Sequence, residues 1–167
     1  MAVTYNKIAS VTVGSGGAAD IEFTSIPGTY DDLKIVFSSR VDSSASSRVD
    51  VSFNGSTSSF TNRWLFGNGS TASSFTNFGR GGGQSSVSGD TANTFANNEI
   101  YIPNYAGSTN KSYSADGVTE TNGTQAYQHL IAGLWSDTSA ITAIKLVPGA
   151  GNFVEHSTAI LYGISNS

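Results

Sequence analysis

The chain has 167 residues, of which 38% are hydrophobic and 12% charged, and its formal net charge is −4. That length suits one domain with its own hydrophobic core. Eight Lys and Arg residues, scattered along the chain, argue against binding to nucleic acid or to an anionic membrane, and the absence of cysteine excludes disulfides, thiolate metal sites and thiol nucleophiles.

Apolar and polar residues alternate in short runs along the whole chain, which is typical of strands with one buried face. In Arg48–Phe53, for example, Val49, Val51 and Phe53 share one face. In chain order, the predicted strands are Tyr5–Val13, Asp20–Ser25, Asp32–Arg40, Arg48–Phe53, Ser59–Leu65, Asn98–Pro103, Lys111–Thr119, Ala126–Trp135, Thr142–Val147 and Ser157–Ile164. For Ser59–Leu65 a short helix is the alternative.

Turn-forming pairs separate many of these runs. The pairs Asn54-Gly55, Asn68-Gly69, Asp116-Gly117 and Asn122-Gly123 supply the positive φ angles of tight turns. The run Gly14-Ser15-Gly16-Gly17 predicts a hairpin between the first two strands, and Pro148-Gly149-Ala150-Gly151 separates the last two. About nine or ten short strands without helices predict an all-β fold, an antiparallel, jelly-roll-like β-sandwich in a single domain over residues 1–167.

One long segment, residues 67–97, lacks this pattern and is predicted to be a loop. Its isolated Phe75, Phe78 and Phe95 indicate packing onto the domain or onto a neighbour. The run Gly79-Arg80-Gly81-Gly82-Gly83-Gln84 lacks the Gly-Lys-Ser/Thr ending of a phosphate-binding loop, so a flexible loop is the better interpretation.

Signals of catalysis and of metal binding are weak. His129 and His156 are too few for a zinc site, and Asp31-Asp32 leads into a strand without a calcium-loop pattern. The sequence therefore predicts no enzyme, no cofactor and no metal. Because a catalytic triad is a spatial arrangement, a polysaccharide-degrading enzyme remains the third and least favoured hypothesis.

Aromatic residues near strand ends are candidates for contacts. Tyr101 and Tyr105 flank Pro103-Asn104, and Trp64 and Trp135 lie near the ends of predicted strands. Such rings stack on sugars or anchor protein interfaces, although core packing is favoured for the two tryptophans.

Several segments together resemble a family. The segment Ile26-Pro27-Gly28-Thr29-Tyr30-Asp31-Asp32-Leu33-Lys34-Ile35 resembles a stretch of tailed-phage structural proteins, often from environmental and cyanobacterial phages. Further pieces fit that pattern in the same order: Phe53-Asn54-Gly55, Glu99-Ile100-Tyr101-Ile102-Pro103-Asn104-Tyr105, Gly151-Asn152-Phe153 and Leu161-Tyr162-Gly163-Ile164. The resemblance spans nearly the whole chain.

The resemblance implies a virion structural protein, assembled in the host cytoplasm, of the head-decoration or cement type. Its expected partners are the major capsid protein or other virion proteins and copies of itself, with a trimer favoured. The low charge agrees, because a lone β domain normally protects its surface and sheet edges with charged residues. The candidate interface residues are Phe75, Phe78, Arg80, Phe95, Tyr101 and Tyr105. The alternative is a fibre or receptor-binding domain that holds host-surface glycan through Tyr101, Tyr105 or Trp135.

Overall fold

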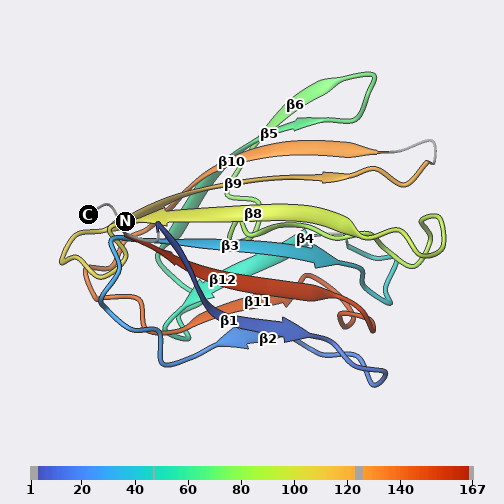
Figure 1. Cartoon of the computed structure of the whole chain (residues 1–167). Coiled ribbons are helices and arrows are strands. Elements are labelled where there is room, and N and C mark those ends of the chain that lie inside the picture. The colour runs from blue at the N-terminus through green and yellow to red at the C-terminus, as the bar shows by residue number, and fades with distance from the viewer. Residues whose placement is uncertain (1–3, 47, 123–125, 166–167) are drawn as a thin grey trace.

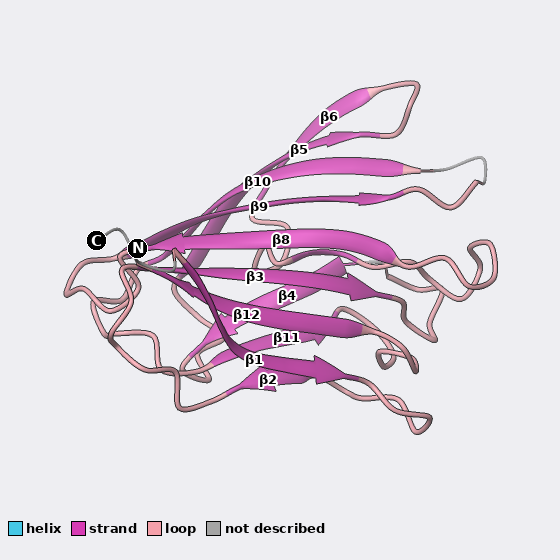
Figure 2. Cartoon of the chain, viewed as in Figure 1, coloured by secondary structure: helices cyan, strands magenta, loops and turns pink. Residues whose placement is uncertain are grey.

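The computed structural model describes residues 4–165, except residue 47 and residues 123–125. Every regular element in this part of the chain is a β-strand (Figures 1 and 2). The strands are β1 (Tyr5–Thr12), β2 (Ile21–Phe23), β3 (Asp32–Ser39), β4 (Arg48–Phe53), β5 (Phe60–Gly67), β6 (Ala72–Thr76), β7 (Gly83–Gln84), β8 (Ala96–Pro103), β9 (Lys111–Thr119), β10 (Tyr127–Trp135), β11 (Ile144–Pro148) and β12 (Thr158–Ile164). The described residues contain no helix with the length and hydropathy of a membrane span.

The strands form two antiparallel sheets. One has the order β1-β12-β3-β8-β9-β10-β5-β6, and the other has the order β2-β11-β4-β7. Eight strands make a jelly roll, in which β1-β12-β3-β8 faces β2-β11-β4-β7 and the chain passes repeatedly from one sheet to the other. The predicted all-β, jelly-roll-like sandwich is confirmed, with twelve strands instead of nine or ten.

Four strands lie outside this jelly roll. The pair β5–β6 is inserted between β4 and β7, the pair β9–β10 is inserted between β8 and β11, and all four continue the larger sheet beyond β8. We call β9, β10, β5 and β6 the sheet extension. Figure 1 shows its outer strands, β5 and β6, rising away from the smaller sheet. Part of the larger sheet therefore has no second sheet opposite it.

The core lies where the two sheets face each other. Inward-facing side chains of β3, such as Ile35, pack against those of β4, such as Val51, and both are fully buried. Phe53 packs edge-on against Tyr113 and Trp135, with ring centroids 5.6 Å apart in each pair. The alternation that predicted the strands thus also identifies the buried face.

Two of the predicted turns are wrong. The Gly14–Gly17 run joins β1 and β2, which lie in different sheets, so it is a connection between sheets and not a hairpin. Asp116-Gly117 lies inside β9, where the Asn98 side chain covers Gly117 so closely that a Cβ atom there would lie 2.4 Å from Asn98 Oδ1. The glycine is needed for this close approach and not for a turn.

The other turn predictions fare differently. Asn68-Gly69 lies in the β5–β6 hairpin, as expected. Asn54 and Gly55 adopt φ angles of 51° and 74° between β4 and β5. Gly123 lies outside the residues that the structure describes, so the turn at Asn122-Gly123 stays a prediction.

The predicted long loop at residues 67–97 contains β6 and β7. Its glycine-rich part is buried over residues 81–86 and is not a flexible loop. The physical reason lies at Gly82, where a Cβ atom would come within 2.8 Å of Val49 O and of Val51 N. Only a residue without a side chain lets this segment run against the β4 backbone.

Candidate functional site

Three of the aromatic candidates are core residues. Tyr105 is fully buried and its hydroxyl donates a hydrogen bond to Pro27 O. Trp64 and Trp135 are each 2% exposed, which confirms the core packing favoured for them. Tyr105 and Trp135 therefore cannot hold a surface glycan, and Tyr105 is not an interface residue.

Tyr101 is half-buried and is committed to a structural contact. Its hydroxyl donates to Asp32 Oδ2 at 2.6 Å, and Asp32 Oδ1 accepts from the backbone N–H of Asn104 at 3.0 Å. The hydrogen bond to Asp32 raises the pKa of Tyr101 to about 12. Tyr101 thus fastens β8 to the start of β3, while Asp32 also holds the chain just after β8 through Asn104. The Tyr101 hydroxyl is already used.

Phe75 and Phe78 are the two exposed aromatic candidates, 46% and 40% accessible. Both belong to a row of rings on the core side of the sheet extension, with neighbouring centroids between 4.7 and 6.0 Å apart. In order, the aromatic row consists of Tyr127, Phe66, Phe75, Phe78, Trp64 and His129. The structure thus brings two predicted residues together with Phe66 and Tyr127, which the sequence did not single out. Phe95 is half-buried just before β8 and makes none of these ring contacts.

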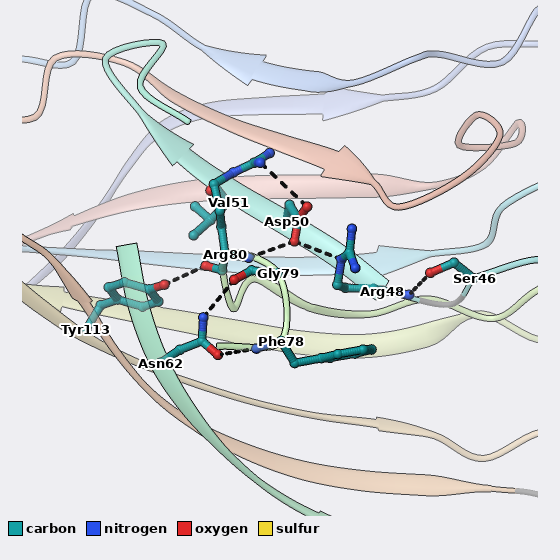
Figure 3. A network of polar contacts seen from close by, with 9 residues as sticks. All are labelled: Ser46, Arg48, Asp50, Val51, Asn62, Phe78, Gly79, Arg80 and Tyr113. Atoms are coloured by element: carbon teal, nitrogen blue, oxygen red, sulfur yellow. Dashed lines mark hydrogen bonds and ion pairs between the residues drawn. The ribbon is translucent and has the colours of Figure 1, made fainter. Parts of the chain in front are cut away.

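Arg80 is not a free surface charge, because its polar atoms hold the glycine-rich segment against β4 (Figure 3). Its Nε donates to Val51 O at 2.9 Å, and its backbone N–H donates to Asp50 Oδ1 at 2.8 Å. Its carbonyl accepts from the Tyr113 hydroxyl at 2.5 Å. The prediction of Arg80 as an interface residue is therefore replaced by a structural role.

The same network fixes Phe78. Asn62 accepts from the backbone N–H of Phe78 at 3.1 Å and donates to Gly79 O at 2.8 Å (Figure 3). The guanidinium of Arg48 lies 5.5 Å from the centre of the Phe78 ring, and its Nε lies 3.0 Å from Asp50 Oδ1. Phe78 is thus exposed but held in place, as a contact residue should be.

The two histidines occupy opposite environments. His129 is 1% exposed beside Trp64, and neither ring nitrogen hydrogen-bonds to a residue that the structure describes. Burial lowers the pKa of His129 to about 4, so the ring is neutral at physiological pH. His156 is exposed. No group of three or more metal-ligating side chains occurs within the described ranges.

The outer face of the sheet extension carries a shallow groove of about 530 Å³. Leu65 of β5 and Leu130 of β10 lie opposite each other there, 54% and 51% exposed. Next to Leu130, Asp116 lies opposite Glu99 in the neighbouring strand, and Lys34 binds Glu99 at 2.7 Å. Partial burial and then the Glu99 charge raise the pKa of Asp116. The groove thus combines an apolar pair with two neighbouring carboxylates, one of which is bound by Lys34.

Strand β6 forms one edge of the larger sheet, and all five of its residues are exposed. Its sequence, Ala-Ser-Ser-Phe-Thr, has no charge and no proline. The opposite edge strand, β1, carries Lys7 and an irregularity in register between Lys7 and Ala9. Charges and bulges are the usual protection of an edge against pairing with another chain, so β6 is the unprotected edge.

Comparison with known proteins finds no matching family model, no matching curated protein and no matching solved structure.

Proposed function

We propose that this chain is a virion structural protein of the head-decoration or cement type, which stabilises a phage head through protein–protein contacts. The observation that carries the proposal is the β5–β6 part of the sheet extension. Its edge strand, β6, is uncharged and all five of its residues are exposed, and apolar side chains are exposed on both faces: Leu65 on one and Phe75 on the other. The order of the segments that resemble tailed-phage structural proteins supports the same conclusion.

Such a surface is a liability for a protein that works alone. An unprotected edge strand pairs with other chains, and exposed apolar groups beside it favour association. Only 12% of the residues are charged, so little like-charge repulsion opposes contact between copies. Association with copies or with other virion proteins turns these features into interface area.

A cement role follows from rigid architecture and from mass action. A jelly roll with its core filled from both sheets changes shape little, so it transmits force between the subunits that it touches. A protein that binds only the assembled lattice shifts the equilibrium toward that lattice. The chain needs no chemistry for this role beyond its surface.

The second candidate, a fibre or receptor-binding domain, loses the residues first proposed for it. Tyr105 and Trp135 are buried, and the Tyr101 hydroxyl is bonded to Asp32. Recognition of a glycan would require another site on the molecule.

The test is the mass of the purified protein at micromolar concentration, measured by native mass spectrometry and light scattering. We expect a closed oligomer, with a trimer favoured by the resemblance. The double variant Leu65→Ser/Leu130→Ser and the edge variant Ser74→Lys are each expected to dissociate it. Tyr5→Ser is the matched control, since Tyr5 is 51% exposed but lies on β1, at the other edge.

Two outcomes contradict the proposal. One is a strictly monomeric wild-type protein at micromolar concentration. The other is an oligomer that survives both the leucine and the edge variants but dissociates with Tyr5→Ser. Mass spectrometry of purified virions completes the test, because a decoration protein must be present in copy numbers that follow the head.

A further inference from the structure

The hydrogen bonds at the two ends of the β5–β6 pair show which backbone groups face the free edge of β6. At one end the N–H of Asn77 donates to Asn62 O at 2.9 Å, and at the other the N–H of Asn68 donates to Thr71 O at 3.2 Å. In an antiparallel pair, residues that exchange backbone hydrogen bonds alternate with residues that do not. Both ends fit one alternation, in which even-numbered residues of β5 bond to odd-numbered residues of β6.

The even-numbered residues of β6 therefore direct their backbone groups away from β5. Ser73 and Phe75 are the residues that bond to β5. Ala72, Ser74 and Thr76 alternate with them and turn their N–H and C=O groups toward the open edge. Figure 1 shows this edge on the outside of the sheet extension, away from the smaller sheet. A row of donors and acceptors of this kind is a template for one more strand.

The other sheet edges in the described part of the chain are protected. Strand β1 carries Lys7 and an irregular register. Strand β2 is three residues long, and its Glu22 forms an ion pair with Lys145 at 3.4 Å. At β7 the Asn98 side chain already binds the backbone N–H and the carbonyl of Gln84, at 3.1 and 2.7 Å. Charge, shortness and coverage are the usual protections of an edge. Among the strands described, a second copy of this chain therefore offers β6 as its open edge.

The sequence of β6 suits pairing with itself. No charged residue occurs between Arg63 and Arg80, so two copies meet at β6 without like-charge repulsion. In an antiparallel pair centred on Ser74, Ala72 of one copy lies opposite Thr76 of the other, so every edge-facing backbone group of β6 finds a partner. A contact between identical strands has a two-fold axis, so it closes at two copies and does not continue into a fibre.

The same register covers the exposed ring of Phe75. This ring lies on the core side of the sheet extension, with its centroid 6.0 Å from that of Phe66 and 5.8 Å from that of Phe78. In the register centred on Ser74, Phe75 lies opposite Ser73 of the second copy, and the two Phe75 residues are diagonal neighbours about 7–8 Å apart, within reach of aromatic side chains. Pairing therefore covers a ring that is 46% exposed in the single chain.

We propose that two copies of this chain pair antiparallel through their β6 strands, with Ser74 of one copy opposite Ser74 of the other. The larger sheets of the two copies then form one continuous sheet across a two-fold axis. The pairing rests on the assembly proposed above and names the strand that makes it. Because a two-fold contact joins copies in pairs, an oligomer closed by it holds an even number of copies: a dimer, or two trimers whose own contacts lie elsewhere on the molecule.

The experiment is disulfide trapping of the full chain, which contains no cysteine and so gives no background. Ser74→Cys places two thiols opposite each other, with Cα atoms about 5.5 Å apart, a distance that a disulfide spans. Ser73→Cys is the matched control, because Ser73 is also exposed but its two copies are diagonal neighbours about 7–8 Å apart, beyond the reach of a disulfide. Under mild oxidation at micromolar concentration, we expect Ser74→Cys to give at least about fivefold more linked pairs than Ser73→Cys.

A second variant, Ser74→Pro, tests the backbone contact without a thiol. Proline removes an N–H that faces the open edge and leaves the hydrogen bonds to β5 in place, so the unfolding midpoint in urea should stay unchanged. The dissociation constant of the pair should rise about thirtyfold, for the loss of two hydrogen bonds of about 1 kcal/mol each. Native mass spectrometry should show an even number of copies for the natural chain and half that number for Ser74→Pro.

The pairing is overturned if Ser74→Cys forms no linked pairs, or if Ser73→Cys forms them as readily. It is also overturned if the natural chain is a monomer or a trimer in solution, or if Ser74→Pro leaves the number of copies unchanged. A closed trimer overturns the pairing but leaves the structural role standing. The structural role fails separately, if purified virions lack the protein, whatever the disulfides show.

Discussion

Part of the destabilisation of this protein by acid should come from one residue, His129. The folded protein holds its pKa at about 4 by burial, whereas the ordinary value is 6.5. Between pH 6.5 and pH 4, therefore, His129 is protonated in the unfolded chain but not in the folded chain. The free energy of unfolding consequently falls as the pH drops toward 4. Above pH 6.5 the histidine is neutral in both states and contributes no pH dependence.

The magnitude follows from the two pKa values. They differ by about 2.5, and each unit corresponds to about 1.36 kcal/mol, so the full loss is about 3 kcal/mol. At pH 5 about 2 kcal/mol of it should already be lost. That is a substantial share of the roughly 5–15 kcal/mol that stabilises a typical domain.

The assay is urea unfolding at pH 8, 7, 6 and 5, followed by tryptophan fluorescence, since Trp64 contacts His129 directly. The comparison variant is His129→Leu, which fills a similar volume with an apolar side chain. Between pH 8 and pH 5 its free energy of unfolding should fall by about 2 kcal/mol less than that of the natural chain. Carboxylates titrate in both proteins and cancel in the difference. Equal pH dependence in the two proteins would refute the assignment to His129.

Two further predictions concern the buried segment around β7. Gly82→Ala places a Cβ atom against the backbone of β4, so it should lower the free energy of unfolding, measured in urea, by about 2–4 kcal/mol. Its control is Gly89→Ala, which has open space around the added Cβ atom and should change the free energy of unfolding by less than about 0.5 kcal/mol. An unchanged urea midpoint for Gly82→Ala would contradict the close approach. Asn98→Ala removes the buried amide that hydrogen-bonds to the backbone N–H of Gln84 at 3.1 Å and to its carbonyl at 2.7 Å, and it should lower the free energy of unfolding by about 2–4 kcal/mol. The exposed neighbour variant Asn97→Ala should leave the free energy of unfolding nearly unchanged. Equal effects of the two variants would argue against the buried contact.

The alternation of apolar and polar residues predicted most of the fold, because a strand with one face toward the core and the other toward solvent carries the two kinds of residue in turn. The bounds of β4 and β9 agree with the prediction to the residue. Strand β6 was missed because both of its faces are exposed, so no alternation exists to detect. Strand β7 has only two residues, and part of its pairing is made by the Asn98 side chain.

Turn chemistry was a weaker guide. It shows where the chain can reverse, but not which sheet the next strand joins, and so the expected hairpin between β1 and β2 was wrong. A glycine also serves where two segments approach closely, as at Gly82 and Gly117, and sequence alone does not separate that use from a turn.

The candidate site was predicted only in part. Of the candidate interface residues, Phe75 and Phe78 are exposed. Tyr105 is buried, and its position after a strand in a polar stretch gives no sign that it turns inward. A signal for Phe66 was present in the sequence: it continues the alternation of Trp64 along β5, so the two rings had to share a face. Nothing local to the sequence places Tyr127 beside Phe66, because that contact depends on the pairing of β10 with β5.

The position of β12 between β1 and β3 has a consequence for biosynthesis. In the larger sheet β1 pairs with β12, so β1 finds its neighbour only after residues 158–164 have left the ribosome. A chain that stops before residue 158 lacks this strand, and both β1 and β3 then keep an unpaired edge, which can pair with other chains. Closure of the sandwich therefore depends on β12, although β1 and β3 are made well before it.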